Sequence, residues 1–258
     1  MTIFLKTFQG VPNAGDVAGP YLVNRISGQP IDTVPILDVS DKEHYMTVGS
    51  TLRRADQNTI VWGSGLIRPD VAPMAPPKHI LGVRGHLTRQ RLIDLGLGTY
   101  RVIGDPGLLM PAFFRPDVVV SYDFGLIPHY TDEDDPICQD VLERGGLVIS
   151  PRLPLERYLR QLLQCKCILT SSLHGLVFAH AYGRPAIWMT LSDKVIGAGF
   201  KFRDYASYFG ERYAGLPKWD PDHSFKDNLS KANCPDMPAD LYDSITLFRE
   251  DLKKRGYL

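Results

Sequence analysis

Short apolar runs alternate with segments of helical periodicity along most of the chain, and this pattern is typical of an α/β protein. The apolar runs, which end in glycine or polar residues, predict strands at residues 3–8, 59–63, 79–83, 100–103, 117–122, 147–150, 167–169 and 186–189. Apolar side chains at helical spacing predict helices at residues 21–26, 89–95, 135–144, 155–164, 173–181 and 240–254. Residues 215–238 are rich in Pro, Asp, Asn and Lys and lack periodicity, so we expect an irregular surface segment there.

The repeated order of strand, loop and helix predicts parallel sheets with helices on both faces. We expect two Rossmann-like halves that face each other across a cleft, with a boundary near Phe114-Arg115-Pro116. The predicted domains are residues 1–115 and residues 116–258, and the helix at 240–254 could cross back to the first half. In folds of this class, ligands bind at the carboxyl ends of the strands.

Composition excludes some classes of partner. The chain of 258 residues has 29 Lys and Arg against 29 Asp and Glu, so it has no overall basic field, and nucleic acid is not an expected partner. The four cysteines lack paired Cys-x-x-Cys spacing and the density of a disulfide scaffold, which predicts reduced thiols and a cytoplasmic protein. No stretch approaches the roughly 18 consecutive apolar residues of a membrane-spanning helix.

The segment at residues 167–185 carries the strongest indication of chemistry. A short apolar strand leads into Ser171-Ser172-Leu-His174-Gly175, and apolar residues then recur at helical spacing up to a Gly-Arg-Pro stop. The first turn of such a helix has free N–H donors and the positive end of the helix dipole, so it favours a phosphate or a carboxylate. The glycine lets another group approach closely. Taken alone, each serine is better explained as a helix cap and the histidine as a core residue. The combination of the three favours an anion site.

Other candidate residues also follow predicted strands. Asn13 and Asp16 lie on a glycine turn, where they could hold a sugar hydroxyl or take its proton, and an Asx turn that caps the next helix is an equal alternative. Arg84 directly follows an apolar strand, and its guanidinium could clamp a carboxylate or phosphate; a solvated or ion-paired arginine is the alternative. The proline before His129 could aim the ring at the cleft, whereas a histidine in a surface turn is the competing interpretation.

The remaining motifs carry less weight. The chain lacks the Gly-x-Gly-x-x-Gly pattern of dinucleotide sites and the Gly-Lys-Ser/Thr phosphate loop. The acidic run at residues 132–135 lacks the ligand spacing of a calcium loop, so we predict no metal site. Lys201 and Arg203 could contact a phosphate, but decoration of a helix start is slightly favoured. His180 lies on another helix face from His174 and is expected to be a packing group.

Taken together, these motifs resemble those of the polysaccharide pyruvyl transferase family, and most closely its bacterial exopolysaccharide ketal pyruvyltransferases. The resemblance rests on Asn13-Ala-Gly-Asp16, Trp62-Gly-Ser-Gly65, Val83-Arg84-Gly85 with Thr88, Gly104-Asp-Pro-Gly107, Ile127-Pro-His-Tyr130 and, most specifically, Ser171-Ser-Leu-His-Gly175 with Gly183-Arg-Pro185. It implies a two-domain fold of the GT-B type. It also implies phosphoenolpyruvate as the donor substrate, a sugar of an exopolysaccharide or of its lipid-linked precursor as the acceptor, and no metal or cofactor.

The resemblance further implies which residues bind the donor. Arg84 and His174 would contact its anionic groups, with Ser171, Ser172 and Gly175 beside them. Ser172 stands where some relatives have an arginine, so one donor contact comes from elsewhere or is a neutral hydrogen bond.

We expect the second half to bind the donor phosphate and the first half to bind the acceptor. His174 would contact the phosphate and donate a proton, because imidazole titrates near neutral pH. Asn13, Asp16 and His129 would bind the acceptor, and Asp16 or His129 would accept a hydroxyl proton. The sequence does not identify the group that protonates the methylene carbon of the donor.

Two other functions are open alternatives at this point. A GT-B glycosyltransferase would use a nucleotide sugar, because a fold does not fix a chemistry. A non-catalytic glycan-binding protein would bind an oligosaccharide without releasing phosphate. Peripheral contact with the inner face of a membrane and the oligomeric state are left open by the sequence as well.

Overall fold

The strands form two separate sheets in which every pairing is parallel. The computed structural model describes residues 1–210, 213 and 216–258. The first sheet has the order β2-β1-β3-β4-β5 and contains β1 (Ile3–Thr7), β2 (Ile31–Pro35), β3 (His44–Met46), β4 (Thr59–Trp62) and β5 (His79–Gly82). The second has the order β7-β6-β8-β9 and contains β6 (Tyr122–Ile127), β7 (Leu147–Val148), β8 (Cys165–Thr170) and β9 (Ala186–Trp188).

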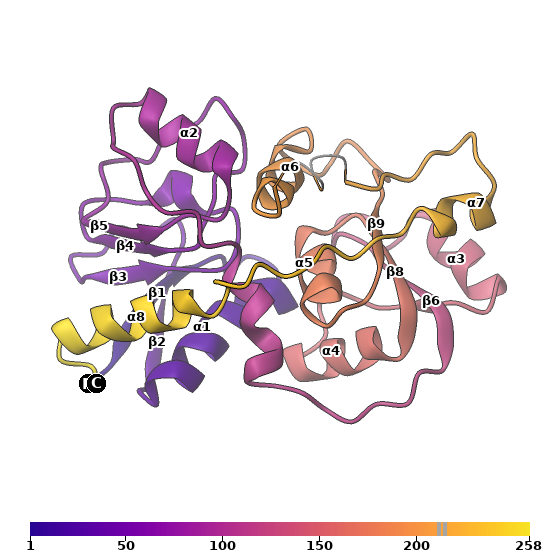
Figure 1. Cartoon of the computed structure of the whole chain (residues 1–258), viewed down its shortest axis with the longest axis horizontal. Helices are drawn as coiled ribbons and strands as arrows, with labels where there is room; N and C mark the ends of the chain where they lie inside the picture. The colour runs from indigo at the N-terminus through magenta and orange to yellow at the C-terminus, as the bar shows by residue number, and fades with distance from the viewer. Residues whose placement is uncertain (211–212, 214–215) are drawn as a thin grey trace.

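Helices pack around both sheets, as Figure 1 shows. They are α1 (Ala14–Ser27), α2 (His86–Asp94), α3 (Pro136–Glu143), α4 (Leu155–Leu163), α5 (Leu173–Ala181), α6 (Phe200–Ser207), α7 (Phe225–Ser230) and α8 (Asp243–Lys254), with the short 3-10 helices η1 (Leu52–Arg54) and η2 (Pro106–Ala112). The arrangement confirms the predicted α/β fold with two parallel-sheet halves of the GT-B type.

Both sheets reverse their strand order next to their first strand. In the first sheet β1 lies between β2 and β3, and in the second β6 lies between β7 and β8. The connections that follow two such neighbouring strands run in opposite directions along the sheet. This leaves a crevice at the carboxyl ends of the two strands. The loops after β1, β3, β6 and β8 are therefore the parts of the chain that the fold offers to a ligand.

Helix α1 begins earlier than the sequence predicts. The Asn13 side chain accepts a hydrogen bond from the Gly15 backbone N–H at 2.9 Å and caps the helix, which ends at Gly28 with a φ of 67°. Asp16 thus lies in the first helical turn, and the alternative of an Asx turn that caps the next helix is confirmed.

Several other predicted boundaries are also wrong. Residues 100–103 form only an isolated bridge between Val102 and Val83, and the strand expected at 117–122 begins at Tyr122 instead. The segment expected to be irregular contains α7, and its first residue, Gly215, lies outside the described residues. The sequence missed β2 and β3, and it anticipated only the start of α6, at Lys201 and Arg203.

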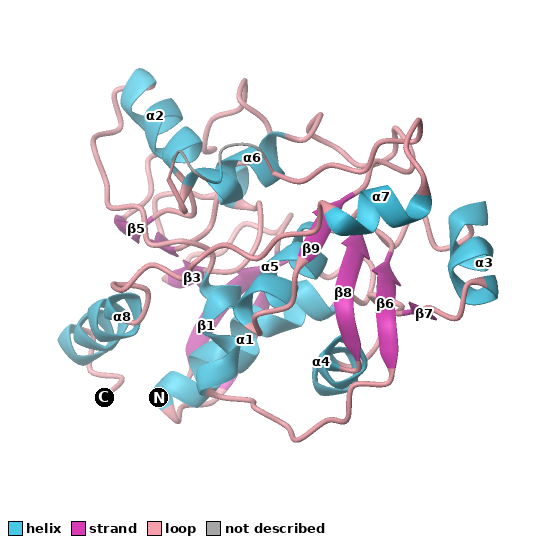
Figure 2. Ribbon diagram, turned by 45° about the vertical axis from the view of Figure 1, so that its right-hand side comes forward, coloured by secondary structure: helices cyan, strands magenta, loops and turns pink. Residues whose placement is uncertain are grey.

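A shared core joins the two halves. Buried side chains of β1 and α1 belong to one apolar cluster with those of α4 and α5, and η2 packs between α1 and α5. Figures 1 and 2 show that α8 returns to the first sheet, where Phe248 stacks on Trp62 with ring centroids 4.2 Å apart. The Tyr45 hydroxyl also donates a hydrogen bond to Asp251 of α8 at 2.6 Å. The C-terminal helix therefore packs on strands from the other end of the chain.

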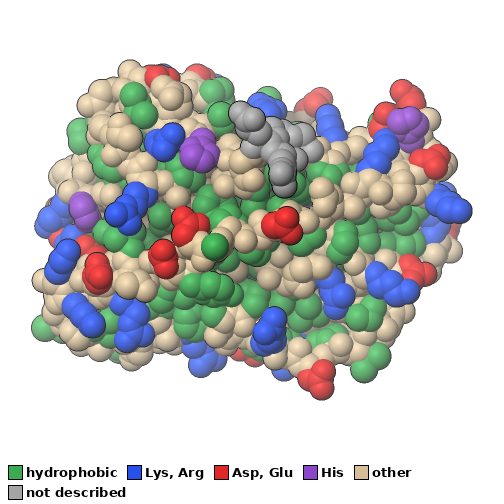
Figure 3. All heavy atoms as spheres, viewed as in Figure 1, with side chains coloured by type: hydrophobic (Ala, Val, Ile, Leu, Met, Phe, Trp, Pro, Cys, Tyr) green, Lys and Arg blue, Asp and Glu red, His purple; other side chains and the backbone are tan. Residues whose placement is uncertain are grey.

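The surface carries charges of both signs. Basic and acidic side chains are interspersed over the face in Figure 3, in keeping with the equal numbers of each in the sequence. Within the described parts of the chain, no helix is both long enough and apolar enough to cross a membrane.

Candidate functional site

A cavity of about 240 Å³ lies where the crevices of the two sheets meet. It is lined by residues that follow β1, β2, β3 and β4 in the first half and β6, β8 and β9 in the second: Phe8, Asn13, Asp16, Ile36, Leu37, Ser50, Thr51, Arg53, Arg54, Ile67, His129, Tyr130, Ser172, Leu173, His174, Ile196 and Lys201. Five sequence-predicted site residues, Asn13, Asp16, His129, Ser172 and His174, thus come together.

His174 lies in the first turn of α5 and faces the start of α1. A methyl group added at Gly15 would occupy the position of the His174 ring, so only glycine permits this approach of the two helices. The buried Nε2 atom of His174 has no hydrogen-bond partner among the described residues. Ser172 precedes the helix without a side-chain capping bond. The first turn of α5 therefore presents an unpaired imidazole nitrogen and a free hydroxyl, beside the N–H groups that every helix start leaves unpaired.

Ser171 has a different place from the one predicted. It is buried and does not line the cavity; its hydroxyl accepts a hydrogen bond from the His129 backbone N–H at 2.7 Å and donates one to Asp132 at 3.2 Å. The Asp132 carboxylate also accepts a hydrogen bond from Ser192 at 2.5 Å. Ser171 and Asp132 therefore hold the loops after β6, β8 and β9 together, and they fix the backbone that carries His129.

Gly175 also serves packing. It lies in α5, where a side chain would overlap the Thr170 hydroxyl, and it does not line the cavity. The structure thus gives Ser171 and Gly175 packing roles and does not bring them into the cavity lining with His174.

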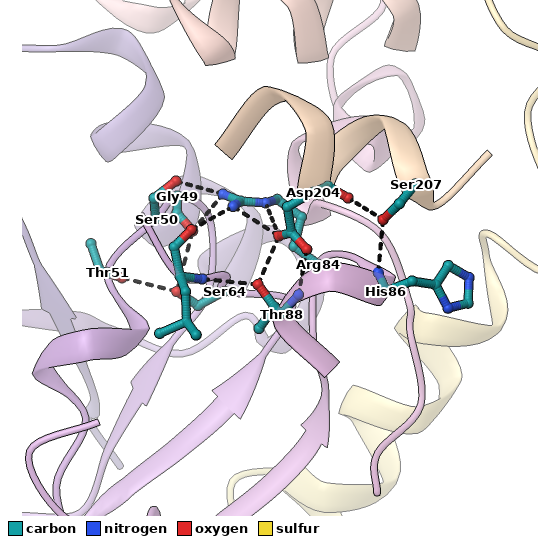
Figure 4. Close-up of polar contacts among 10 residues, drawn as sticks. Gly49, Ser50, Thr51, Ser64, Arg84, His86, Thr88, Asp204 and Ser207 are labelled. Carbon is teal, nitrogen blue, oxygen red and sulfur yellow. Dashed lines mark hydrogen bonds and ion pairs between the residues drawn. The ribbon is translucent and has the colours of Figure 1, made fainter. Parts of the chain in front are cut away.

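Arg84 is fully buried in an ion pair with Asp204 of α6 (Figure 4). Its Nε and Nη2 atoms both lie 2.9 Å from Asp204 Oδ2, and Nη1 donates a hydrogen bond to the Ser50 hydroxyl at 2.6 Å. Nη2 also donates to the Leu66 carbonyl at 2.9 Å. These partners use the guanidinium and Arg84 does not line the cavity, so the structure shows the ion-paired arginine that was the alternative to a donor clamp. Arg84 instead positions Ser50, which does line it.

The positive charge of the cavity comes from two arginines that the sequence did not indicate and from Lys201, for which a phosphate contact was the less favoured interpretation. Arg53 and Arg54 belong to η1 after β3, and Lys201 lies in the first turn of α6. Among the described residues, none of these three side chains has an ion-pair partner. The acidic side chain in the lining is Asp16, so cationic groups exceed anionic ones.

Burial shifts the pKa values of the groups in the cavity. Desolvation raises the pKa of Asp16 to about 7, although the Lys201 charge opposes this shift. Desolvation and the Lys201 charge lower the pKa of His174 to about 3 and that of His129 to about 4. Desolvation, with the Arg84 charge, lowers the pKa of Lys201 to about 8.

These values change one predicted role. Both histidines of the cavity are neutral at neutral pH in the free protein. The predicted proton donation by His174 needs the charged ring, whereas the neutral imidazole of the free protein is a hydrogen-bonding group and a base.

His180 packs away from the cavity, as predicted. Its Nδ1 atom lies 2.9 Å from the Tyr205 hydroxyl and its Nε2 atom 3.1 Å from the Tyr213 hydroxyl. Across residues 1–210, 213 and 216–258, no three His, Cys, Asp or Glu side chains form a group that could hold a metal ion.

Comparisons with known proteins identify relatives of this chain. The chain is 29% identical over 229 residues to the uncharacterized protein L143 of Acanthamoeba polyphaga mimivirus, a match that covers 81% of this chain and 75% of that protein. It is 28% identical over 176 residues to the succinoglycan biosynthesis protein ExoV of Rhizobium meliloti (strain 1021), covering 64% of this chain and 54% of ExoV.

A solved structure shares the fold. The crystal structure of a functionally uncharacterized protein from Klebsiella pneumoniae subsp. pneumoniae NTUH-K2044 aligns with a TM-score of 0.51 and 11% identity, over 85% of this chain and 93% of that one. Residues 13–193, which include the starts of α1 and α5 and the loops between them that line the cavity, match the family described as polysaccharide pyruvyl transferase. The chain belongs to the polysaccharide pyruvyl transferase family.

Proposed function

We propose that this protein is a ketal pyruvyltransferase that uses phosphoenolpyruvate. It transfers the pyruvyl group to two hydroxyls of one sugar, in an exopolysaccharide or its lipid-linked precursor, and releases phosphate. Membership of the family supports pyruvyl transfer to a polysaccharide, and the relative ExoV is named for succinoglycan biosynthesis. The donor and the cyclic ketal product are what the proposal adds.

The observation that carries the proposal is the positive charge of a small cavity. Arg53, Arg54 and Lys201 line it together with one carboxyl group, that of Asp16. Phosphoenolpyruvate joins a carboxylate and a phosphate on three carbons, so it supplies two anionic groups within a short distance. The volume of about 240 Å³ lies below the range of roughly 300–1,000 Å³ typical of drug-sized pockets, and it fits this donor better than a nucleotide sugar.

The start of α5 is the part of the cavity best suited to the donor phosphate. Its unpaired N–H groups and positive dipole end favour an anion, and the neutral His174 ring adds a hydrogen bond without a charge. In the proposed reaction the residues after β8 thus bind the donor phosphate, which gives this role to the second half, residues 116–258.

Three polar residues of the lining, Asn13, Asp16 and His129, are suited to bind the sugar. The carboxyl group of Asp16, with a pKa of about 7, can accept a hydroxyl proton near neutral pH. Asn13 uses its side-chain oxygen to cap α1, which leaves its amide NH₂ for a sugar oxygen. His129 is neutral and can act as a second acceptor. The first half, residues 1–115, would therefore bind most of the acceptor.

The proposed chemistry has two additions to one carbon. Protonation of the methylene carbon makes the central carbon electrophilic, and the first hydroxyl attacks it. Phosphate then leaves, the second hydroxyl attacks, and the leaving phosphate carries away the second hydroxyl proton. The product is a six- or five-membered ketal ring with the carboxylate retained.

Mass spectrometry of a panel of pyranosides incubated with protein and phosphoenolpyruvate tests the proposal. We expect one sugar to gain a pyruvate ketal with release of one phosphate. We also expect His174→Ala to lower turnover by about 10²- to 10³-fold, as loss of one group that stabilises transition-state charge does. His223→Ala, which changes an exposed histidine paired with Asp220, is the matched control. Consumption of a nucleotide sugar without phosphoenolpyruvate turnover, or oligosaccharide binding without phosphate release, would contradict the proposal.

A further inference from the structure

Lys201 is a buried cation in the lining of the cavity. Its side chain lines the cavity and the residue is only 9% exposed. No hydrogen bond or ion pair connects its ammonium group to another described residue. Its charge opposes the rise in the pKa of Asp16 and adds to the fall in the pKa values of His129 and His174. These three residues come from α1, the loop after β6 and α5, and they line the same cavity as Lys201.

Helix α6 holds Lys201 firmly in this place. Phe200 and Phe202 on either side of it are buried. Asp204 accepts hydrogen bonds from the Thr88 backbone N–H at 2.7 Å and from the Thr88 hydroxyl at 2.8 Å, in addition to its ion pair with Arg84 (Figure 4). The helix comes from the second half of the sequence, but Asp204 binds it to Arg84, which follows β5, and to Thr88 of α2 in the first half. Lys201 also lies beyond residues 13–193, the part of the chain that matches the family.

We propose that Lys201 is the acid that protonates the methylene carbon of the donor, an inference that rests on the proposed function. The ammonium N–H bond breaks, and the electron pair of the carbon–carbon double bond forms the new C–H bond of a methyl group. The first sugar hydroxyl adds to the central carbon and gives its proton to the ionised Asp16. Asp16 then returns that proton to the neutral Lys201 amine, which restores both charges before phosphate leaves.

Proton affinities in the cavity favour Lys201 for this step. Desolvation and the Arg84 charge lower the pKa of Lys201 from 10.5 to about 8, while the charges of Asp16 and Asp132 raise it. Lys201 is therefore mostly protonated at pH 7 and is a stronger acid than an ordinary lysine. His129 and His174 are neutral there.

The other basic groups of the lining cannot take this role. Arg53 and Arg54 have guanidinium groups, which do not release protons in proteins. They are suited to bind the anionic donor, and proton transfer then falls to the ammonium group of Lys201.

The charge-preserving substitution Lys201→Arg separates proton transfer from anion binding. We expect Lys201→Arg to bind phosphoenolpyruvate within about threefold of the wild type by calorimetry. We expect its turnover to fall by about 10²- to 10⁴-fold, the usual contribution of general acid catalysis. Lys201→Met should lose both phosphoenolpyruvate binding and turnover. Lys226→Met, which changes an exposed lysine on α7, should keep both.

Three further measurements exclude a structural explanation, and a fourth follows the transferred proton. Thermal unfolding of Lys201→Met should be unchanged or shifted upward, because the substitution removes a buried charge without an ion-pair partner. Methylamine should restore part of the turnover of Lys201→Ala, and kcat/KM of the wild type should fall above about pH 8 as the ammonium group deprotonates. In D₂O the wild-type product should carry one deuterium in its methyl group.

The outcomes distinguish the two proposals. If the wild type forms the ketal and Lys201→Arg retains turnover within tenfold, Lys201 is not the acid and only this inference is overturned. If the wild type releases no phosphate with any acceptor, the proposed function fails, and the role of Lys201 fails with it.

Discussion

Removal of the negative charge of Asp204 should destabilise the protein far more than removal of an exposed carboxylate. In the substitution Asp204→Asn, an oxygen remains to accept from the Thr88 backbone, but the Arg84 guanidinium loses its counter-charge. Both side chains of the pair are 0% exposed, so water cannot replace the lost partner. Loss of one member of a buried ion pair costs about 3–5 kcal/mol, and we expect Asp204→Asn to lower the free energy of unfolding by that amount.

The chain offers a matched control for this measurement. Asp140 and Arg144 form an ion pair at 2.8 Å on the surface of α3, with side chains 38% and 49% exposed. Asp140→Asn should cost less than about 1 kcal/mol, because solvent screens an exposed pair. The two substitutions make the same chemical change at similar distances, so they differ mainly in burial.

Urea unfolding followed by circular dichroism measures both free energies, and thermal unfolding should show a decrease of about 10 °C for Asp204→Asn. The double variant Arg84→Met/Asp204→Leu should be more stable than Asp204→Asn, because it leaves no unpaired charge in the interior. Equal and small losses for Asp204→Asn and Asp140→Asn would refute the argument that burial makes this pair structural.

Three further predictions concern the cavity and the core. Gly15→Ala should abolish phosphoenolpyruvate binding in calorimetry, because its methyl group would displace the His174 ring, and unchanged affinity would contradict the close approach of α1 and α5. Phe248→Ala should lower the free energy of unfolding by about 3–5 kcal/mol in urea, because α8 loses its stack on Trp62; a cost below 1 kcal/mol would show that α8 does not depend on it. His180 is held neutral by burial, with a pKa of about 3 against 6.5 in the unfolded chain, so its contribution to stability is present above pH 6.5 and lost as the pH falls towards 3. His180→Phe should reduce that pH slope by up to about 1.4 kcal/mol per pH unit, and an unchanged slope would exclude this origin.

Much of the fold could be predicted because its strands are continuous apolar runs. Residues 59–62 and 79–82 are strands both in the prediction and in the structure. Strands of parallel sheets are covered on both faces, so they are mainly apolar and stand out in the sequence. The misses are elements that owe their structure to their neighbours. Strand β3 has only three residues, and β2 carries Asp32 and Thr33, yet both pair with β1. No local pattern could indicate that pairing.

The candidate site was predictable where its residues follow recognisable strands. Asp16, His129 and His174 come after β1, β6 and β8, and the topology brings them together. Arg84 also follows a strand, but its partner Asp204 lies 120 residues away, and nothing near Arg84 in the sequence indicates that its charge is already paired.

The arginines of η1 were missed for the opposite reason, and for Lys201 a phosphate contact was only the less favoured interpretation. The residues around these three side chains are typical of ordinary surface cations. Only the folded chain turns the three side chains toward one cavity. Arg53 and Arg54 also follow β3, a strand that the sequence did not reveal, so the rule that ligands lie at strand ends could not be applied to them.

The contrast between Arg84 and Lys201 argues that the cavity is built for an anion. Both cations are buried, but Arg84 is matched by the Asp204 carboxylate, whereas Lys201 has no ion-pair partner among the described residues. The carboxyl that acts on Lys201, that of Asp16, is itself only partly ionised at neutral pH because burial raises its pKa to about 7. An unmatched buried charge is costly, and an anionic donor between α5 and α6 would supply the missing counter-charge. Because Asp204 fixes the helix that carries Lys201, the Arg84–Asp204 pair would then act on the donor without touching it.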